Sequence, residues 1–112
     1  MKRNEIWLIN LEPTIGAEIR KTRPAIIVND DDLGILPLKI IVPVTDWKDK
    51  YEAAVWMIKI KPDNENNLQK TSSADCFQVR SLSEERLIKK IGRIDETTMK
   101  KISKALAKVL KI

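Results

Sequence analysis

The sequence predicts a mainly β fold that ends in an α-helix, within one domain spanning residues 1–112. Two observations predict this class. Short apolar runs rich in β-branched residues, separated by turn-forming Pro, Gly, Asn and Asp, fill the first three quarters of the chain. Helical periodicity with polar N-caps begins only after residue 81. We therefore expect a small, strongly bent sheet or partial barrel with a helix packed on it.

Five strands are expected in this sheet. They cover residues 5–10, 24–29, 38–45, 53–60 and 71–79. Pro43 falls inside the third strand, and because proline has no N–H to donate, we expect that strand at an edge or at a bulge. Trp7 and Trp56 lie within strand patterns and are expected in the core.

Two helices are expected after the strands. Ser81 begins a capping box, and Ser83 is an alternative N-cap, so a short helix should run to about residue 90. Asp95 is a good N-cap for the closing helix. The apolar positions of that helix recur at helical spacing, as core or a subunit interface would require, and are Met99, Ile102, Leu106 and Val109 or Leu110.

Composition excludes several kinds of function. The 112 residues include no histidine and one cysteine, which excludes His-based acid–base pairs, His-ligated metals, zinc knuckles and an intramolecular disulfide. No apolar run approaches the roughly 20 residues that span a bilayer, and no hydrophobic signal region follows Met1, so we expect a cytoplasmic protein. Catalysis would depend on Arg, Lys, carboxylates, hydroxyls or the thiol of Cys76, which is expected to be buried and unreactive.

The net charge of +5 is concentrated in the last quarter of the chain. Residues 86–112 carry +7 and residues 1–85 carry −2. A basic segment is typical of a partner of polyanions, but a solvated helix face is the favoured interpretation. The acidic triplet at residues 30–32 is likewise expected to form a turn and not a divalent-cation site.

Basic residues gather just before the second expected strand. Arg20, Lys21 and Arg23 lie there, and Pro24 biases Arg23 toward an extended conformation at the end of the strand. A guanidinium held in this way can bind a phosphate in a bidentate manner and offset charge on its oxygens. The alternative is a surface ion pair between Arg23 and Glu18.

Polar side chains at other strand ends are weaker candidates. Thr45 could orient a phosphate or a 2′-hydroxyl, or could merely stabilise a turn. Trp47, in a polar turn, is the tryptophan that could face a ligand. The remaining candidates are potential readers of phosphate or bases, and are Lys70, Ser72, Gln78 and Arg80.

Taken in order, these segments resemble the MazF/PemK family of toxin endoribonucleases, the mRNA interferases of type II toxin–antitoxin systems. The matching residues are 5–16, 18, 22–28, 42–45, 70–72, 78–81, 86–87 and 91–92. No single segment is decisive, but the ordered set is specific and covers nearly the whole chain.

The resemblance implies a compact SH3-like barrel of five to seven strands (PemK/CcdB-like), with a short helix and a C-terminal amphipathic helix. It implies a homodimer that cleaves single-stranded RNA or mRNA at a short sequence, with no metal and no cofactor. Attack by the 2′-hydroxyl would leave a 2′,3′-cyclic phosphate and a 5′-hydroxyl. Cleavage of mRNA in this way would inhibit translation and growth. It further implies a MazE/PemI-like antitoxin whose tail occupies the RNA groove.

Site residues carry over by position. Arg23 matches the catalytic arginine of the family, Thr45 its catalytic threonine, and Glu18 an active-site carboxylate of some members. The residues expected to contact RNA are Thr14, Arg20, Lys21, Trp47, Lys70, Ser72, Gln78 and Arg80.

Departures from the family pattern leave the general base open. Ala17 stands where many members have Ser or His, and Asp75 and Phe77 stand where some have an Arg and an Asp that act as acid and base. Two other functions also remain open on the sequence. One is a non-catalytic toxin of the same fold that binds a protein, as gyrase poisons do, and the other is a general RNA-binding barrel.

Overall fold

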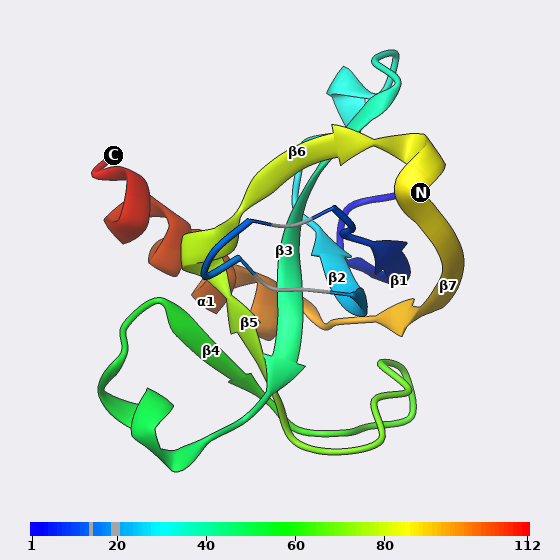
Figure 1. Ribbon diagram of the computed structural model, residues 1–112. Coiled ribbons are helices and arrows are strands. Elements are labelled where there is room, and N and C mark those ends of the chain that lie inside the picture. Colours follow the sequence, from blue (N-terminus) through cyan, green and yellow to red (C-terminus); the bar gives the residue numbers. More distant parts are fainter. Residues whose placement is uncertain (14, 19–20) are drawn as a thin grey trace.

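A computed structural model describes residues 1–13, 15–18 and 21–112, which form seven strands and a C-terminal α-helix (Figure 1). The strands are β1 (Glu5–Asn10), β2 (Thr22–Ile27), β3 (Leu38–Asp46), β4 (Met57–Ile60), β5 (Ser72–Asp75), β6 (Arg80–Ser83) and β7 (Leu87–Arg93). The helix α1 spans Glu96–Leu110. Short 3₁₀ turns connect some strands, and are η1 (Asp31–Leu33), η2 (Asp49–Ala53), η3 (Cys76–Gln78) and η4 (Glu84–Arg86). The expected mainly β class with a closing helix is confirmed.

The strands form one antiparallel sheet in the order β4-β5-β3-β2-β1-β7. The strand β3 is shared, because its first part pairs with β6 and its last part with β5. Among the described residues β4 and β7 end the sheet without pairing with each other. The sheet is therefore strongly bent but open, which agrees with the expected bent sheet or partial barrel of five to seven strands.

Pro43 lies in the middle of this sheet, so the expectation that it marks an edge is wrong. On one side it is opposite Ala25 of β2. On the other side it falls in a gap, since pairing with β6 ends at Ile41 and pairing with β5 begins at Val44. A proline cannot donate to a ladder, and a gap between two partner strands accommodates it.

Two apolar cores lie on opposite faces of β2 and β3, because successive strand residues point to opposite sides. The larger core contains Ile26 and Val42 and is covered by α1. The smaller core contains Ile27 and Ile41, and Trp7 packs against it.

The closing helix begins as the sequence predicts. The Asp95 carboxylate accepts the N–H of Thr98 at 2.7 Å, and this hydrogen bond lowers the pKa of Asp95. Met99 and Ile102 are buried in the larger core. No helix in the described ranges is long and apolar enough to cross a membrane.

The predicted short helix after residue 83 is wrong. The Ser83 hydroxyl accepts the N–H of Glu85 at 3.3 Å, as an N-cap does, but it begins only the three-residue turn η4. Leu87 then enters β7, where it is buried opposite Ile9 of β1. The long-range pairing with β1 therefore overrides the local helix signal.

Two expected strands are shorter than predicted, and two further strands are not predicted. Residues 49–53 form η2 and residues 76–78 form η3, so only β4 and β5 remain of the two expected strands. The unpredicted strands are β6, which follows η3, and β7, where a short helix is expected. Trp56 therefore precedes β4 and is 38% exposed, packing edge-to-face on Phe77 with ring centres 6.0 Å apart, so its predicted core position is wrong.

Gly92 permits a close approach of two backbones. A Cβ at this position would overlap the backbone oxygen of Glu65, which accepts the N–H of Arg93 at 3.0 Å. The loop that holds Glu65 is organised by buried Asn66, whose side-chain oxygen accepts the N–H of Leu68 at 3.0 Å. A glycine at this point of β7 is thus a packing requirement.

Glu5 connects β1 to the N-terminus and to β7. Its carboxylate accepts the Trp7 indole N–H at 2.9 Å and the Lys2 N–H at 3.0 Å, and it lies 3.3 Å from the Lys90 ammonium. Burial alone would raise the pKa of Glu5, but these donors and the N-terminal charge outweigh it and lower the pKa from 4.5 to about 2.

We predict that Glu5→Gln lowers stability at pH 7 by about 2 kcal/mol. A carboxylate with a depressed pKa stabilises the fold fully above pH 4.5 and loses that contribution as the pH falls toward 2. Urea unfolding at several pH values should show the wild-type advantage shrinking across this window. Glu85→Gln, on an exposed side chain, is the control. An unchanged wild-type advantage down to pH 2 would contradict the assignment.

Candidate active site

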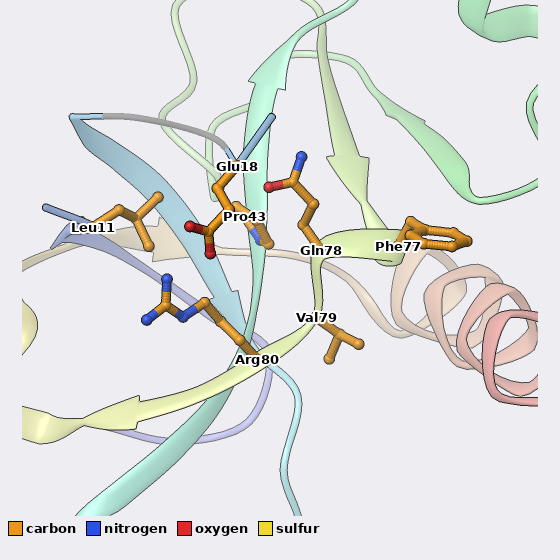
Figure 2. Close-up of a pocket in the computed structure, with 7 residues that line it drawn as sticks. All are labelled: Leu11, Glu18, Pro43, Phe77, Gln78, Val79 and Arg80. Carbon is orange, nitrogen blue, oxygen red and sulfur yellow. The ribbon is translucent and has the colours of Figure 1, made fainter. Parts of the chain in front are cut away.

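A cleft of about 260 Å³ brings together three residues that the sequence predicts for the site, Glu18, Gln78 and Arg80 (Figure 2). The full lining consists of Leu11, Glu18, Pro43, Phe77, Gln78, Val79 and Arg80. They come from the loop between β1 and β2, the middle of β3, and the segment from η3 into β6. The cleft therefore lies where β3 changes partner.

The polar side chains of the lining extend into this space. Figure 2 shows the Glu18 carboxylate over Pro43, the Arg80 guanidinium on the same side, and the Phe77 ring directed away, toward α1. The Glu18 carboxylate accepts the N–H of Ile15 at 2.6 Å, which orients it from within its own loop. Both a carboxylate and a guanidinium thus face the cleft.

Arg23 and Thr45 lie on neighbouring strands of the same face. Ala25 of β2 is opposite Pro43 of β3, and the same antiparallel register continued by two residues places Arg23 opposite Thr45. Opposite residues share a face, so both side chains lie on the side of the sheet that carries Pro43 and the cleft. Both residues are partly buried. The strand pair therefore presents a guanidinium and a hydroxyl beside the cleft.

Asp75 lies next to the cleft, and the sequence presents it only as a departure from the family pattern. Its register on β5 continues from Ala74 opposite Val44, which places buried Asp75 beside Pro43. One carboxylate oxygen accepts the N–H of Phe77 at 3.2 Å and the other accepts the Gln78 amide N–H at 3.1 Å. Burial raises the pKa of Asp75, although these hydrogen bonds oppose the rise. Asp75 thus orients Gln78, and its short spacing to Gln78 at a strand end is the signal that could have identified it.

Lys70 and Ser72 do not join the cleft. They line a separate hollow of about 260 Å³, where Lys70 lies 2.9 Å from the Asp46 carboxylate. Asp46 is opposite Ser72, one position along from the pair formed by Thr45 and Ser73. Strand alternation therefore puts this hollow on the other face of the sheet.

The other predicted RNA contacts are dispersed. Trp47 packs against Tyr51 of η2 and Lys59 of β4. The rings of Trp47 and Tyr51 meet edge-to-face with centres 5.9 Å apart, and the Lys59 ammonium lies 5.0 Å from the Trp47 ring centre. Lys21 is exposed, and its backbone, with φ of 72°, is in the left-handed region. Its backbone N–H donates to the Glu12 carboxylate at 2.8 Å. Thr14 and Arg20 lie outside the described residues.

Cys76 is buried and the acidic triplet forms a turn, as the sequence predicts. Cys76 is fully buried, and burial together with the charge of Asp75 raises the pKa of its thiol to about 12. Asp30 caps η1 by accepting the N–H of Asp32 at 2.9 Å, so the acidic triplet is a turn. In the part of the chain that the structure describes, no group of three or more Cys, Asp or Glu is arranged to hold a metal ion.

The arrangement suits a phosphodiester. Guanidinium groups bind phosphate in a fixed geometry and offset charge on its oxygens, and a hydroxyl orients the same group. A carboxylate beside them can accept a proton. The Gln78 amide, held in place by Asp75, can form hydrogen bonds with polar groups of a ligand. A guanidinium, a carboxylate and an amide line the cleft, from Arg80, Glu18 and Gln78. Thr45 and Arg23 are outside its lining, on the same face of the sheet.

Comparison with known protein families gives a match over nearly the whole chain. The model of the PemK-like, MazF-like toxins of type II toxin–antitoxin systems matches residues 2–110. The chain belongs to this family. Family membership rests on nearly the full length of the chain, which includes the sheet and the helix.

Two relatives and two solved structures illustrate the family. Endoribonuclease MazF9 of Mycobacterium tuberculosis is 30% identical over 95% of this chain and 92% of its own. Endoribonuclease PemK of Escherichia coli is 30% identical over 98% of this chain and 82% of its own. MazF from Deinococcus radiodurans has the same fold, with a TM-score of 0.82 at 17% identity over 100% of this chain and 97% of that one. An endoribonuclease from Mycobacterial species, solved with its cognate antitoxin, has a TM-score of 0.76 at 18% identity over 98% and 94%.

We predict that Asp75→Ala destabilises this family member by about 1–3 kcal/mol, because it removes the acceptor of a backbone N–H and of the Gln78 amide. Asp75→Asn keeps an acceptor for the Phe77 N–H and should lose less. Urea unfolding measures both losses, and NMR of the Gln78 side-chain amide reports whether its environment changes. Wild-type stability with unchanged Gln78 signals in Asp75→Ala would show that Asp75 does not organise the cleft.

Proposed function

We propose that the chain is a cytoplasmic endoribonuclease toxin that cleaves single-stranded RNA at a short sequence without a metal ion, and that an antitoxin neutralises it. The observation that carries this proposal is the register of β2 and β3, in which Ala25 is opposite Pro43. The same register continued by two residues puts Arg23 opposite Thr45, beside a cleft lined by Glu18, Gln78 and Arg80. The endoribonuclease relatives and the antitoxin complex of a structural neighbour support it.

The reaction uses the RNA as its own nucleophile. The 2′-oxygen forms a bond to the adjacent phosphorus while the bond from phosphorus to the 5′-oxygen breaks. One proton leaves the 2′-hydroxyl and one reaches the departing 5′-oxygen, so the products are a 2′,3′-cyclic phosphate and a 5′-hydroxyl. The protein must hold the nucleotide in line, stabilise the charge on the phosphoryl oxygens and handle both protons.

The proposal assigns one residue to each of these tasks. Arg23 binds the phosphate and gives a proton to the departing oxygen, which as an alkoxide is more basic than a guanidine. Thr45 orients the phosphate or the 2′-hydroxyl. Glu18 takes the 2′-proton, since its carboxylate faces the same cleft.

The remaining predicted residues are proposed to position the RNA chain. Gln78 and Arg80 contact the nucleotide within the cleft. The others contact the flanking nucleotides and are Thr14, Arg20, Lys21, Trp47, Lys70 and Ser72.

We predict that Arg23→Ala lowers the cleavage rate by about 10²–10³ and Thr45→Ala by a smaller factor, because each loses a contact to the phosphate. Wild type and variants are incubated with a long defined RNA in EDTA, and the cut sites and end groups are mapped. Arg93→Ala, which removes an exposed arginine of β7, is the control and should cut at the wild-type rate.

The same assay separates the alternatives. Folded Arg23→Ala and Thr45→Ala proteins that cut at the wild-type rate would refute the residue assignment. Loss of wild-type cleavage in EDTA would refute metal independence. RNA that binds in a steeply salt-dependent manner without being cut would indicate a general RNA-binding protein.

We further propose that the chain acts as a homodimer. Leu38 and Ile40 on the outer face of β3 are exposed, whereas the alternate residues Lys39 and Ile41 are buried. Ile35, in the segment just before β3, is 94% exposed. Together with Leu33 and Leu36 of the same segment they form an exposed apolar surface, and such surfaces mark protein interfaces.

We predict that the double variant Leu38→Asp with Ile40→Asp is monomeric, because two buried charges would oppose the interface. Sedimentation velocity on wild type and variant measures the molecular mass. Ile88→Asp, on an exposed apolar residue of β7, is the matched control and should leave the dimer intact. Equal masses for wild type and the double variant would rule out this surface as the interface.

A further inference from the structure

Two exposed aromatic rings adjoin the cleft. Phe77, in the lining of the cleft, is 65% exposed, and Trp56, just before β4, is 38% exposed. Their ring centres lie 6.0 Å apart, with 69° between the ring planes. An edge-to-face pair covers one face of one ring, so this contact leaves the other aromatic faces uncovered. The sequence assigns neither ring to RNA, because it places Trp56 in the core and presents Phe77 as a departure from the family pattern.

Backbone hydrogen bonds hold both aromatic residues in place. The Trp56 carbonyl accepts the N–H of Cys76 at 2.9 Å, and Cys76 is fully buried. The Phe77 N–H donates to the Asp75 carboxylate at 3.2 Å, and the other oxygen of that carboxylate accepts the Gln78 amide at 3.1 Å. The two rings are therefore positioned relative to the cleft before a ligand arrives, which lowers the entropic cost of binding.

Phe77 and Gln78 are neighbours in the chain but extend in different directions. The Gln78 side chain extends toward the side of the cleft where Glu18 lies, whereas the Phe77 ring points away, toward α1 (Figure 2). A nucleotide in the cleft can therefore meet the amide, and the next nucleotide of the same strand can meet the ring. The first contact uses a polar edge of a base and the second uses its aromatic face.

A groove of about 380 Å³ beside α1 begins where the two rings end. Val55, the residue before Trp56, lines this groove, and α1 also packs against η3, which carries Phe77. The charged residues of the groove lining are three lysines and one glutamate, namely Lys101, Lys104, Lys108 and Glu52. Positive charge exceeds negative charge in this lining, which suits the phosphates of a strand that leaves the cleft over the rings.

We propose that Phe77 and Trp56 form a stacking subsite for an unpaired RNA base next to the nucleotide held in the cleft. This inference rests on the RNA substrate proposed above. Aromatic side chains bind the π-faces of bases in single strands, and the Arg80 guanidinium in the same lining as Phe77 suits the intervening phosphate. Every base has a π-face, so the subsite adds affinity, while hydrogen-bonding groups of the cleft select the sequence.

A single NMR signal tests the contact directly. Phe77 is the only phenylalanine of the chain, so labelling with 4-fluorophenylalanine gives one ¹⁹F signal, which reports on this ring. The probe is an RNA of about 12 nucleotides around a mapped cut site, with a 2′-deoxynucleotide there so that it binds without being cut. A stacked base should shift the signal through its ring current. When each nucleotide in turn is made abasic, the shift should disappear at one position only, adjacent to the cut site.

Fluorescence anisotropy with the same RNA, labelled, measures the gain in affinity. Phe77→Leu keeps an apolar side chain but removes the aromatic face, and should weaken binding about tenfold. Phe77→Trp retains a face and should bind within about twofold of the wild type, and Trp56→Leu should weaken binding by a smaller factor than Phe77→Leu. Ile88→Ala, at an exposed apolar residue of β7, is the matched control and should bind as the wild type does.

The outcomes separate the stacking subsite from the ribonuclease activity. Wild-type affinity in Phe77→Leu, or an unchanged ¹⁹F signal with RNA bound, overturns the subsite even in a chain that cuts RNA. If the chain cuts no RNA, the ribonuclease proposal fails, and oligo(U) of the same length becomes the probe. Weaker binding of oligo(U) by Phe77→Leu than by the wild type then supports the subsite alone. A Phe77→Leu protein that binds RNA normally but sediments at a lower mass assigns the rings to contact between protein chains, and overturns the subsite.

Discussion

The strand β3 hydrogen-bonds with three other strands, and this sharing determines where the candidate residues on the strands, Arg23, Thr45 and Arg80, lie. Pairing with β2 sets Ala25 opposite Pro43, and the same register continued by two residues puts Arg23 opposite Thr45. Pairing with β5 ends with Ala74 opposite Val44, next to Asp75, and pairing with β6 sets Arg80 opposite Ile41. A slip of one residue in any of these ladders would move a side chain to the opposite face. The change of partner at Pro43 opens the space in which the cleft forms.

The parts of the fold that the sequence predicts well depend on local signals. Strand β3 was expected from its β-branched run, and α1 from the Asp95 cap and its apolar spacing. The errors share one cause, which is contact with residues distant in the chain. Pairing with β1 extends residues 87–93 despite a real N-cap at Ser83, and the gap between β6 and β5 accommodates Pro43 in mid-sheet.

The candidate site shows the same division between local signals and contacts made by residues distant in the chain. Family resemblance identified Arg23 and Thr45, but only the register of two strands brings them together. Lys70 and Ser72 were grouped with them because they lie in matching segments, yet strand alternation directs them to the other face. The role of Asp75 was hidden because it depends on hydrogen bonds across η3, which sequence spacing suggests but does not fix.

The distribution of charge gains a new meaning from the groove beside α1. From sequence, the basic last quarter of the chain is adequately explained as a solvated helix face. In the structure, one side of that face borders an aliphatic floor, and Glu52 lines the same hollow as Lys101, Lys104 and Lys108. The cleft likewise carries a carboxylate, Glu18, in the same lining as Arg80. The two surfaces differ in what surrounds these charges. Val55, Met57 and Ile58 border the lysines of α1 with aliphatic side chains, whereas the cleft adds the polar amide of Gln78 to its charged groups.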